Sequence, residues 1–311
     1  RAAFDRVVEL LARQPELGDP AADRRVDIPR VGGGRASGRV QIDGVDFSYD
    51  GSDEQVLSDI DIDIPAGSTV AFVGRTGSGK STLVKLLTRL YDPDRGQIRL
   101  DGAPIDRVPL REPRGEIGFV PQEPLLFSMT IRQNIRFGLD ALEYDETVDR
   151  EAPNSPLVPE GDDPARRRTQ EERIQQAVDV AGLRPDIDSF SEGLETLVGE
   201  RGVTLSGGQK QRITLARALL VDPRLLILDD ALSSVDTRTE HLILDHLEHI
   251  MEGRTSIILT HRFNALNRVD CIFVLDEGRI VERGTHEELL ERGGVYADMY
   301  ERQQLEETLP S

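Results

Sequence analysis

Alternating hydrophobic and polar positions predict β-strands in the first third of the chain. In residues 57–64, apolar residues, mainly isoleucine, alternate with aspartate, which indicates a half-buried strand of an antiparallel sheet. Residues 40–49 alternate in the same way until Gly44, where we expect a β-bulge. Apolar residues at 97–100 and 117–120 predict two further short strands.

The pattern changes farther along the chain. Residues 124–220 are mainly helical in pattern, whereas the apolar runs at 225–228, 256–259 and 271–275 are typical of buried strands. A helix is expected through 237–251, between two of these strands. Strands that alternate with helices predict an α/β fold, in which helices cover a parallel sheet.

Three segments depart from this pattern. Residues 1–13 place apolar side chains at helical spacing and predict a short amphipathic helix. Residues 14–38 are polar and rich in glycine and proline, so we expect a linker, followed by a domain over 39–311. Residues 140–168 contain nine acidic residues, four arginines and four prolines, and we expect mainly a mobile surface insertion there.

Composition narrows the possible functions. A net charge of -19 disfavours a surface for nucleic acid or anionic lipid, so we expect no nucleic-acid partner. No run approaches the roughly 18 apolar residues that a membrane-spanning helix needs. The single cysteine, Cys271, excludes an internal disulfide bond.

The most specific chemical signal is a glycine-rich loop between a predicted strand at 70–73 and a predicted helix at 82–87. The loop fits the pattern G-x-x-x-x-G-K-[ST] at every fixed position, which identifies a P-loop. Its backbone N–H groups surround phosphate oxygens, Lys80 reaches the β- and γ-phosphates, and the Ser81 hydroxyl binds Mg²⁺. We expect phosphate contacts from Gly74, Arg75, Thr76, Gly77, Ser78, Gly79, Lys80, Ser81 and Thr82.

Two further motifs belong to the same chemistry. The apolar strand at 225–228 ends in Asp229 and Asp230, the Walker B pattern of P-loop proteins. We expect Asp229 to hold Mg²⁺, directly or through water, and Asp230 to stand where a base would polarise the attacking water. Leu205 begins the sequence LSGGQ, which opens a helix and offers an anion site through a hydroxyl and backbone N–H groups. The expected contacts there are Ser206, Gly207, Gly208 and Gln209.

Taken in order, these motifs resemble those of the nucleotide-binding domain of an ATP-binding cassette (ABC) transporter, over residues 39–305. The resemblance assigns Tyr49 to stacking on adenine. It assigns Gln122 to contacts with Mg²⁺ and the transmembrane partner, and Asp236 to the D-loop. It makes His261 the residue that contacts the γ-phosphate.

The resemblance also implies an architecture. It predicts a P-loop NTPase with a RecA-like parallel core, an N-terminal antiparallel β-subdomain and an α-helical signature subdomain over 124–220. Two such cassettes face each other head to tail, with ATP between the P-loop of one and the signature of the other. The implied cofactors are ATP and Mg²⁺, and the implied partners are a second cassette and the chain's own transmembrane domain with its coupling helices.

Flanking residues resemble those of exporters. The sequence at 199–202 resembles the exporter X-loop, and residues 1–13 resemble the end of a last transmembrane helix that runs into its cassette. The resemblance therefore places the cassette on the cytoplasmic face of a membrane, tethered through an N-terminal transmembrane domain.

One position departs from the family. At position 230 the family carries glutamate, whereas this chain carries aspartate, which shortens the side chain by one methylene. The combination of Asp230 with an intact signature resembles the degenerate-site subunit of a heterodimeric exporter for drugs or lipids. A homodimer with a slower base and a purely regulatory nucleotide-binding subunit remain as alternatives.

Overall fold

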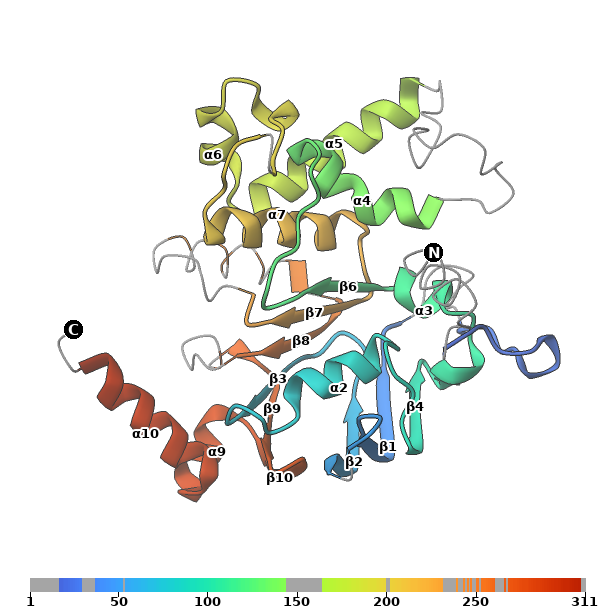
Figure 1. Cartoon of the computed structure of the whole chain (residues 1–311). Coiled ribbons are helices and arrows are strands. Elements are labelled where there is room, and N and C mark those ends of the chain that lie inside the picture. Colours follow the sequence, from blue (N-terminus) through green and yellow to red (C-terminus); the bar gives the residue numbers. More distant parts are fainter. Residues whose placement is uncertain are drawn as a thin grey trace, which may run out of the picture.

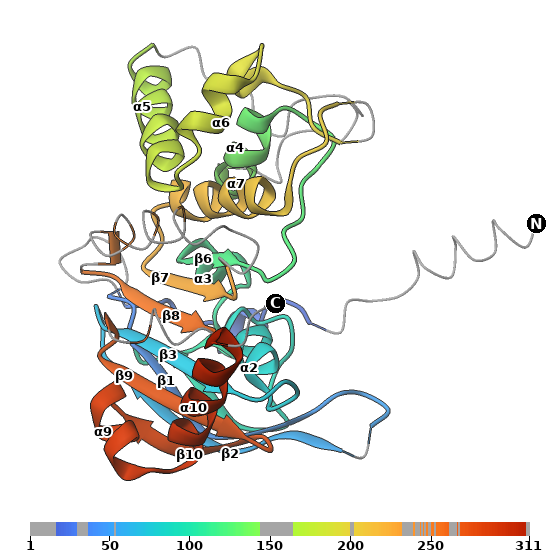
Figure 2. The ribbon, with the colours of Figure 1, turned by 90° about the vertical axis from the view of Figure 1, so that its left-hand side faces the viewer.

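The computed structural model describes the chain in several stretches. These are residues 17–29, 37–52, 54–143, 164–199, 202–231, 253–260 and 268–308, with isolated positions between 239 and 266. Within them, a small sheet, a larger sheet and a layer of helices lie one above another (Figures 1 and 2). No helix in these stretches has both the length and the apolar content to cross a bilayer.

The smaller sheet is antiparallel, with strand order β2-β1-β4-β5. Its strands are β1 (Val40–Ser48), β2 (Gln55–Ile64), β4 (Arg95–Leu100) and β5 (Ala103–Pro104). Leu57, Ile60, Ile62 and Ile64 are buried, as their alternation with aspartate predicts. The pairing of β1 with β2 shifts register between Ile42 and Val45, which confirms the bulge expected at Gly44.

The larger sheet has strand order β10-β9-β3-β8-β7-β6, and its neighbours pair in parallel except β10, which is antiparallel to β9. Every residue of β3, β7 and β8 is buried, because structure covers both faces of the sheet. The predicted parallel core is therefore confirmed. Its strands are β3 (Thr69–Gly74), β6 (Ile117–Val120), β7 (Leu225–Asp229), β8 (Thr255–Leu259), β9 (Cys271–Asp276) and β10 (Arg279–Gly284).

Helices cover the larger sheet on both sides. The helix α2 (Lys80–Leu87) packs between the two sheets, and α9 (His286–Arg292) and α10 (Val295–Thr308) pack near β9 and β10 (Figure 2). The upper layer of Figure 1 contains α4 (Ile131–Glu143), α5 (Pro164–Val180), α6 (Arg184–Ser189) and α7 (Gly207–Leu220). Shorter helices are η1 (Ala22–Arg24), η3 (Ile105–Arg107), α3 (Arg111–Gly115) and η4 (Gly193–Glu195).

The residues of β7 divide between two hydrophobic cores. Leu225 and Ile227 face the core that contains α2, whereas Leu226 and Leu228 face the core beneath the helical layer. This alternation follows the two-residue period of a strand, and it fixes α2 and α7 on opposite faces of the larger sheet.

The leading segment differs from the linker that its composition predicts. The Val26 amide donates to the Arg107 carbonyl at 3.0 Å, and the Leu110 amide donates to Asp19 at 2.8 Å. Ile28 is only 5% exposed and belongs to the core between the sheets. Residues 17–29 therefore pack against the β-subdomain, because one apolar side chain and a few polar bonds suffice to hold this segment in place.

The predicted boundaries of the acidic insertion are also corrected. α4 continues to Glu143 and α5 already begins at Pro164, a favoured residue for the first position of a helix. Both ends of the 140–168 stretch are thus helical, and residues 144–163 lie outside the described residues. The amphipathic segment at 1–13 lies outside them too, and the described positions within 237–251 are helical.

Candidate nucleotide-binding site

The glycine-rich loop joins the end of β3 to the start of α2. A Cβ atom on Gly74 would lie 2.2 Å from the Leu275 carbonyl oxygen, so only glycine permits this close approach of β3 to β9. Gly79 has a φ of +104°, and a Cβ atom there would lie 2.6 Å from a methyl carbon of Leu57. Packing against neighbouring strands thus holds the loop open, with residues 75–77 exposed.

Lys80 folds back over this loop. Its side chain is buried, and its ammonium donates to the carbonyls of Gly74 at 2.8 Å and Arg75 at 3.1 Å. Burial lowers the pKa of Lys80, while the charges of Asp230 and Asp229 oppose that shift. An incoming phosphate would therefore meet a cation that is already positioned and only partly compensated.

Asp229 is a buried carboxylate at the end of β7. Burial, and then the neighbouring charge of Asp230, raise the pKa of Asp229 to about 6, although Lys80 and Lys85 act in the opposite direction. Among the described residues, no three His, Cys, Asp or Glu side chains form a metal cluster. A magnesium ion here would take Asp229, the exposed Ser81 hydroxyl and phosphate oxygens, a set that suits its chemistry.

Asp230 lies just beyond β7 in a left-handed backbone conformation, with a φ of +42°. Its amide donates to the Leu259 carbonyl at 2.8 Å, and its carbonyl accepts a longer bond, at 3.4 Å, from the Gln211 side chain. Aspartate tolerates this conformation better than most residues. The backbone of Asp230 is thereby fixed at the sheet edge where the glycine-rich loop also lies.

Tyr49 lies beside the helix that follows the loop. Its hydroxyl shares a hydrogen bond of 2.9 Å with the Thr82 hydroxyl and accepts one of 3.2 Å from Lys85. Its ring contacts Phe47 and Tyr91 edge to face. This position is compatible with an adenine platform, and the stacking role stays a prediction.

Gln122 is exposed in the connection that follows β6. Val120 pairs with Leu228, so Gln122 lies beyond the same edge of the sheet as Asp229. The carboxyl ends of parallel strands collect ligand-binding residues in this way. Asp236 and His261, which the sequence assigns to the same site, lie outside the described residues.

The signature opens α7 with a capping box. The Ser206 hydroxyl accepts from the Gln209 amide at 3.2 Å, and the Gln209 side chain accepts from the Ser206 amide at 2.9 Å. This start of α7 belongs to the helical layer, on the opposite side of the larger sheet from α2 (Figures 1 and 2). The structure therefore brings the P-loop and Walker B residues together and keeps the signature apart from them.

Sequence reasoning missed two features of the site. Lys85 donates to the Tyr49 hydroxyl, and its charge lowers the pKa of Asp229. Because the chain has only three lysines, a lysine so close to the P-loop was a signal that the sequence offered. Asp186 bonds the signature residue Gln209 at 2.8 Å. No local pattern marks Asp186, because its contact is made only by the packing of α6 against α7.

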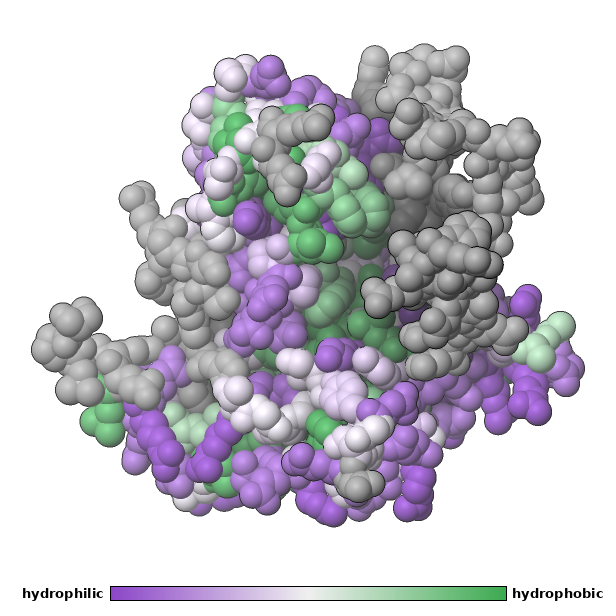
Figure 3. Space-filling model, in the orientation of Figure 1, coloured by the Kyte–Doolittle hydropathy of each residue, from purple (hydrophilic) through white to green (hydrophobic). Residues whose placement is uncertain are grey.

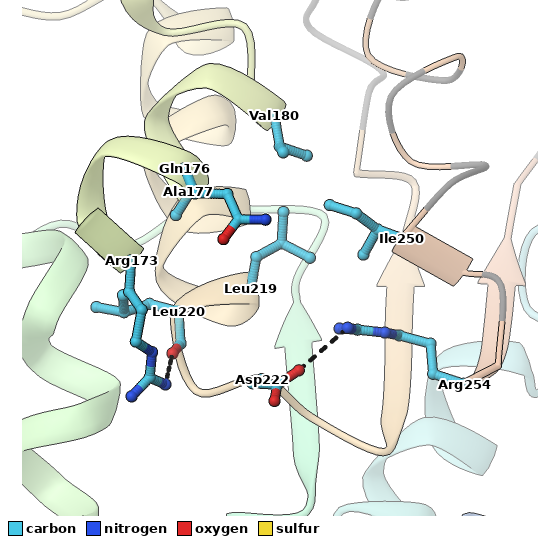
Figure 4. A pocket seen from close by; sticks show the side chains of 9 residues that line it. All are labelled: Arg173, Gln176, Ala177, Val180, Leu219, Leu220, Asp222, Ile250 and Arg254. Carbon is cyan, nitrogen blue, oxygen red and sulfur yellow. Dashed lines mark hydrogen bonds and ion pairs between the residues drawn. The ribbon is translucent and has the colours of Figure 1, made fainter. Parts of the chain in front are cut away.

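A separate cavity of about 320 Å³ lies between α5 and the end of α7 (Figure 4). Arg173 donates to the Leu220 carbonyl at 2.5 Å, and Arg254 pairs with Asp222 at 3.1 Å (Figure 4). None of the described residues that line it belongs to the P-loop, the Walker B strand or the signature. This cavity is therefore not part of the candidate nucleotide site.

The sequence of this chain is similar to those of known proteins. A model of the ABC transporter family matches residues 57–233, more than half of the chain. A probable multidrug resistance ABC transporter ATP-binding/permease protein, YheI of Bacillus subtilis (strain 168), is 41% identical over 98% of this chain and 46% of its own length. The ATP-dependent lipid A-core flippase of Alkalilimnicola ehrlichii is 42% identical over 86% of this chain and 41% of its own length.

The fold agrees with a solved structure described as a bacterial Atm1-family ABC exporter with ATP bound. The TM-score is 0.79 at 34% identity, over 97% of this chain and 47% of that chain. The chain thus spans less than half the length of these relatives. The P-loop, Walker B strand and signature lie within the matched region, and the chain belongs to the ABC transporter family as a nucleotide-binding domain, an ATPase.

Proposed function

We propose that this chain drives a membrane exporter from the cytoplasmic face by binding and hydrolysing MgATP between two head-to-tail cassettes. The observation that carries the proposal is the separation of the P-loop from the signature by the larger sheet. One copy supplies two half-sites and cannot close either alone. A second cassette, placed head to tail, completes both.

At the P-loop half-site, the geometry of the described residues supports several roles, and family position suggests the others. The backbone amides of the exposed residues 75–77 and the ammonium of Lys80 would hold the β- and γ-phosphates. Ser81 and Asp229 would hold Mg²⁺, which neutralises charge on the phosphates when it is bound. Tyr49 would stack on adenine, and Gln122 would contact Mg²⁺ and the transmembrane partner. Asp236 would belong to the D-loop and His261 would contact the γ-phosphate, as their family positions imply.

Asp230 makes this half-site weak. Hydrolysis needs a carboxylate that orients a water molecule for attack on the γ-phosphorus while the bond to the β-phosphate oxygen breaks. Aspartate falls short of the glutamate position by roughly 1 Å, and a displacement of that size can cost about 100-fold in rate. The charge persists, so MgATP binding survives. We therefore infer a heterodimer, in which this chain's signature completes a faster site on a partner that carries glutamate.

The connection between β6 and α4 supplies a surface for the transmembrane partner. Hydrophobic side chains gather in the recess between the helical layer and the sheet (Figure 3). Leu125, in this connection, is 65% exposed. An exposed apolar side chain close to Gln122 in the sequence suits contact with a coupling helix of the transmembrane domain. Such a contact would link substrate binding in that domain to the nucleotide site.

The test compares the ATPase activity of the parent chain with that of Asp230→Glu. We expect slow turnover in the parent and a gain of at least about tenfold in the variant, because the carboxylate then reaches the attacking water. Asp188→Glu, an exposed position on α6, is the matched control and should change nothing. Fast turnover in the parent would exclude the weak-site assignment and favour a homodimer with aspartate as its base.

A further inference from the structure

A continuous set of hydrogen bonds joins α6 to the signature. One carboxylate oxygen of Asp186 accepts from the Gln209 side chain at 2.8 Å, and the other accepts from Arg212 at 2.6 Å. The side chains of Asp186 and Arg212 are 18% and 10% exposed. Charge-assisted bonds in such a sheltered place are strong and directional.

The carboxylate of Asp186 decides how the Gln209 amide is oriented. A carboxylate can only accept hydrogen bonds, so the NH₂ group of Gln209 must face Asp186. The carbonyl oxygen of that amide then faces the Ser206 amide, from which it accepts at 2.9 Å. A flipped amide would set two donors against each other at Ser206 and two acceptors against each other at Asp186.

This orientation prepares the surface that meets a nucleotide. The Ser206 hydroxyl accepts from the backbone N–H of Gln209 at 3.2 Å, so the hydrogen of that hydroxyl is directed to another acceptor. The amides of Gly207 and Gly208, in the first turn of α7, have no intrahelical acceptor. A hydroxyl donor and two backbone donors therefore share the start of α7.

Arg212 adds a positive charge that also requires a carboxylate at position 186. Its Nε atom is buried and finds no hydrogen-bond partner among the described residues, so Asp186 provides its compensation. An asparagine at 186 could still accept from Gln209, but its own NH₂ group would then face the Arg212 guanidinium. Only a carboxylate satisfies both neighbours at once.

We propose that Asp186 is a positioning residue for the ATP site that this chain's signature completes on a partner cassette. It acts through Gln209 on Ser206 and on the first turn of α7. The inference rests on the proposed function, because it requires the signature to close over a nucleotide held by another chain. It predicts that one change on α6 impairs the partner's site and spares this chain's own P-loop.

The experiment uses the full-length transporter, assembled with its partner, and measures steady-state ATP turnover. Asp186→Asn should lower kcat about tenfold, with the KM for ATP changed less than threefold. Binding of a fluorescent ATP analogue to this chain's P-loop should be unchanged, which a general loss of structure would not allow. Asp188→Asn removes the same charge from an exposed position of the same helix and is the matched control.

Two further variants separate the outcomes. Gln209→Leu breaks the same bond from the other end and should reproduce the loss, so it serves if Asp186→Asn does not fold. Ser206→Ala tests the signature itself. Normal turnover in Asp186→Asn and Gln209→Leu, with impaired turnover in Ser206→Ala, would overturn the positioning role of Asp186 but leave the proposed function intact. Normal turnover in Ser206→Ala would overturn the proposed function, and the inference with it.

Discussion

The P-loop and the signature both bind phosphate in the proposed dimer, but different interactions hold them in shape. The P-loop is fixed by backbone packing, since Gly74 and Gly79 leave no room for a side chain against β9 and β2. The signature is fixed by side chains, through Gln209 and its partner Asp186. Substitutions that add a side chain should therefore disturb the P-loop, whereas substitutions that remove a hydrogen-bonding group should disturb the signature.

The largest effect is expected at the only cation that folds over the P-loop among the described residues. Lys80→Ala should weaken MgATP binding about 100-fold, equivalent to about 3 kcal/mol, because a charge-assisted contact with phosphate is lost. Isothermal titration calorimetry measures this. Lys210→Ala, at an exposed position of α7, is the control. Unchanged affinity in Lys80→Ala would contradict the P-loop assignment.

Added volume at the P-loop should destabilise the protein. Gly74→Ala places a Cβ atom 2.2 Å from a backbone oxygen that cannot move independently of β9. We expect a loss of about 2–3 kcal/mol in the free energy of unfolding, measured with denaturant. Gly18→Ala, where nothing lies within 4 Å of the added atom, should be neutral. Equal stability of the two variants would show that close packing does not hold the loop.

Removing the buried charge should stabilise the nucleotide-free protein. The raised pKa of Asp229, about 6, means that the folded state binds a proton more tightly than the unfolded state. Stability therefore falls as pH rises from about 4 to about 6. Asp229→Asn should gain about 1–2 kcal/mol at pH 7 and show no advantage near pH 4, while it loses Mg²⁺-dependent ATP binding. A destabilised variant at pH 7 would contradict this account.

The smallest effect concerns the leading segment. Asp19→Ala removes the acceptor for the Leu110 amide and should cost about 1 kcal/mol in the free energy of unfolding. Asp23→Ala, exposed on η1, removes the same charge without this bond and should cost nothing measurable. If the two variants unfold alike, the bond between Asp19 and Leu110 does not contribute to stability.

The features that the sequence predicted correctly share a local or periodic origin. The alternation in 57–64 reports burial directly, and the apolar runs of β3, β7 and β8 report a sheet covered on both faces. The glycine-rich loop has a fixed spacing because its backbone must curve around phosphates.

The features that it missed depend on tertiary contacts. The packing of Ile28 cannot be predicted from a polar, proline-rich stretch, because a single apolar residue has no period. Asp186 is one of many acidic residues, and only the packing of α6 beside α7 gives it two partners. The helices α4 and α7 are also far apart in the sequence although they pack together, so sequence separation gave no guide to which helices meet.

The unequal half-sites are tested most directly by counting nucleotides in the assembled full-length transporter. The transporter is loaded with radiolabelled MgATP, freed of excess ligand, and sampled over several turnovers of the faster site. We predict that close to one ATP per dimer stays intact, held at the P-loop beside Asp230, while the other is converted to ADP. Loss of both triphosphates at the same rate would contradict the account.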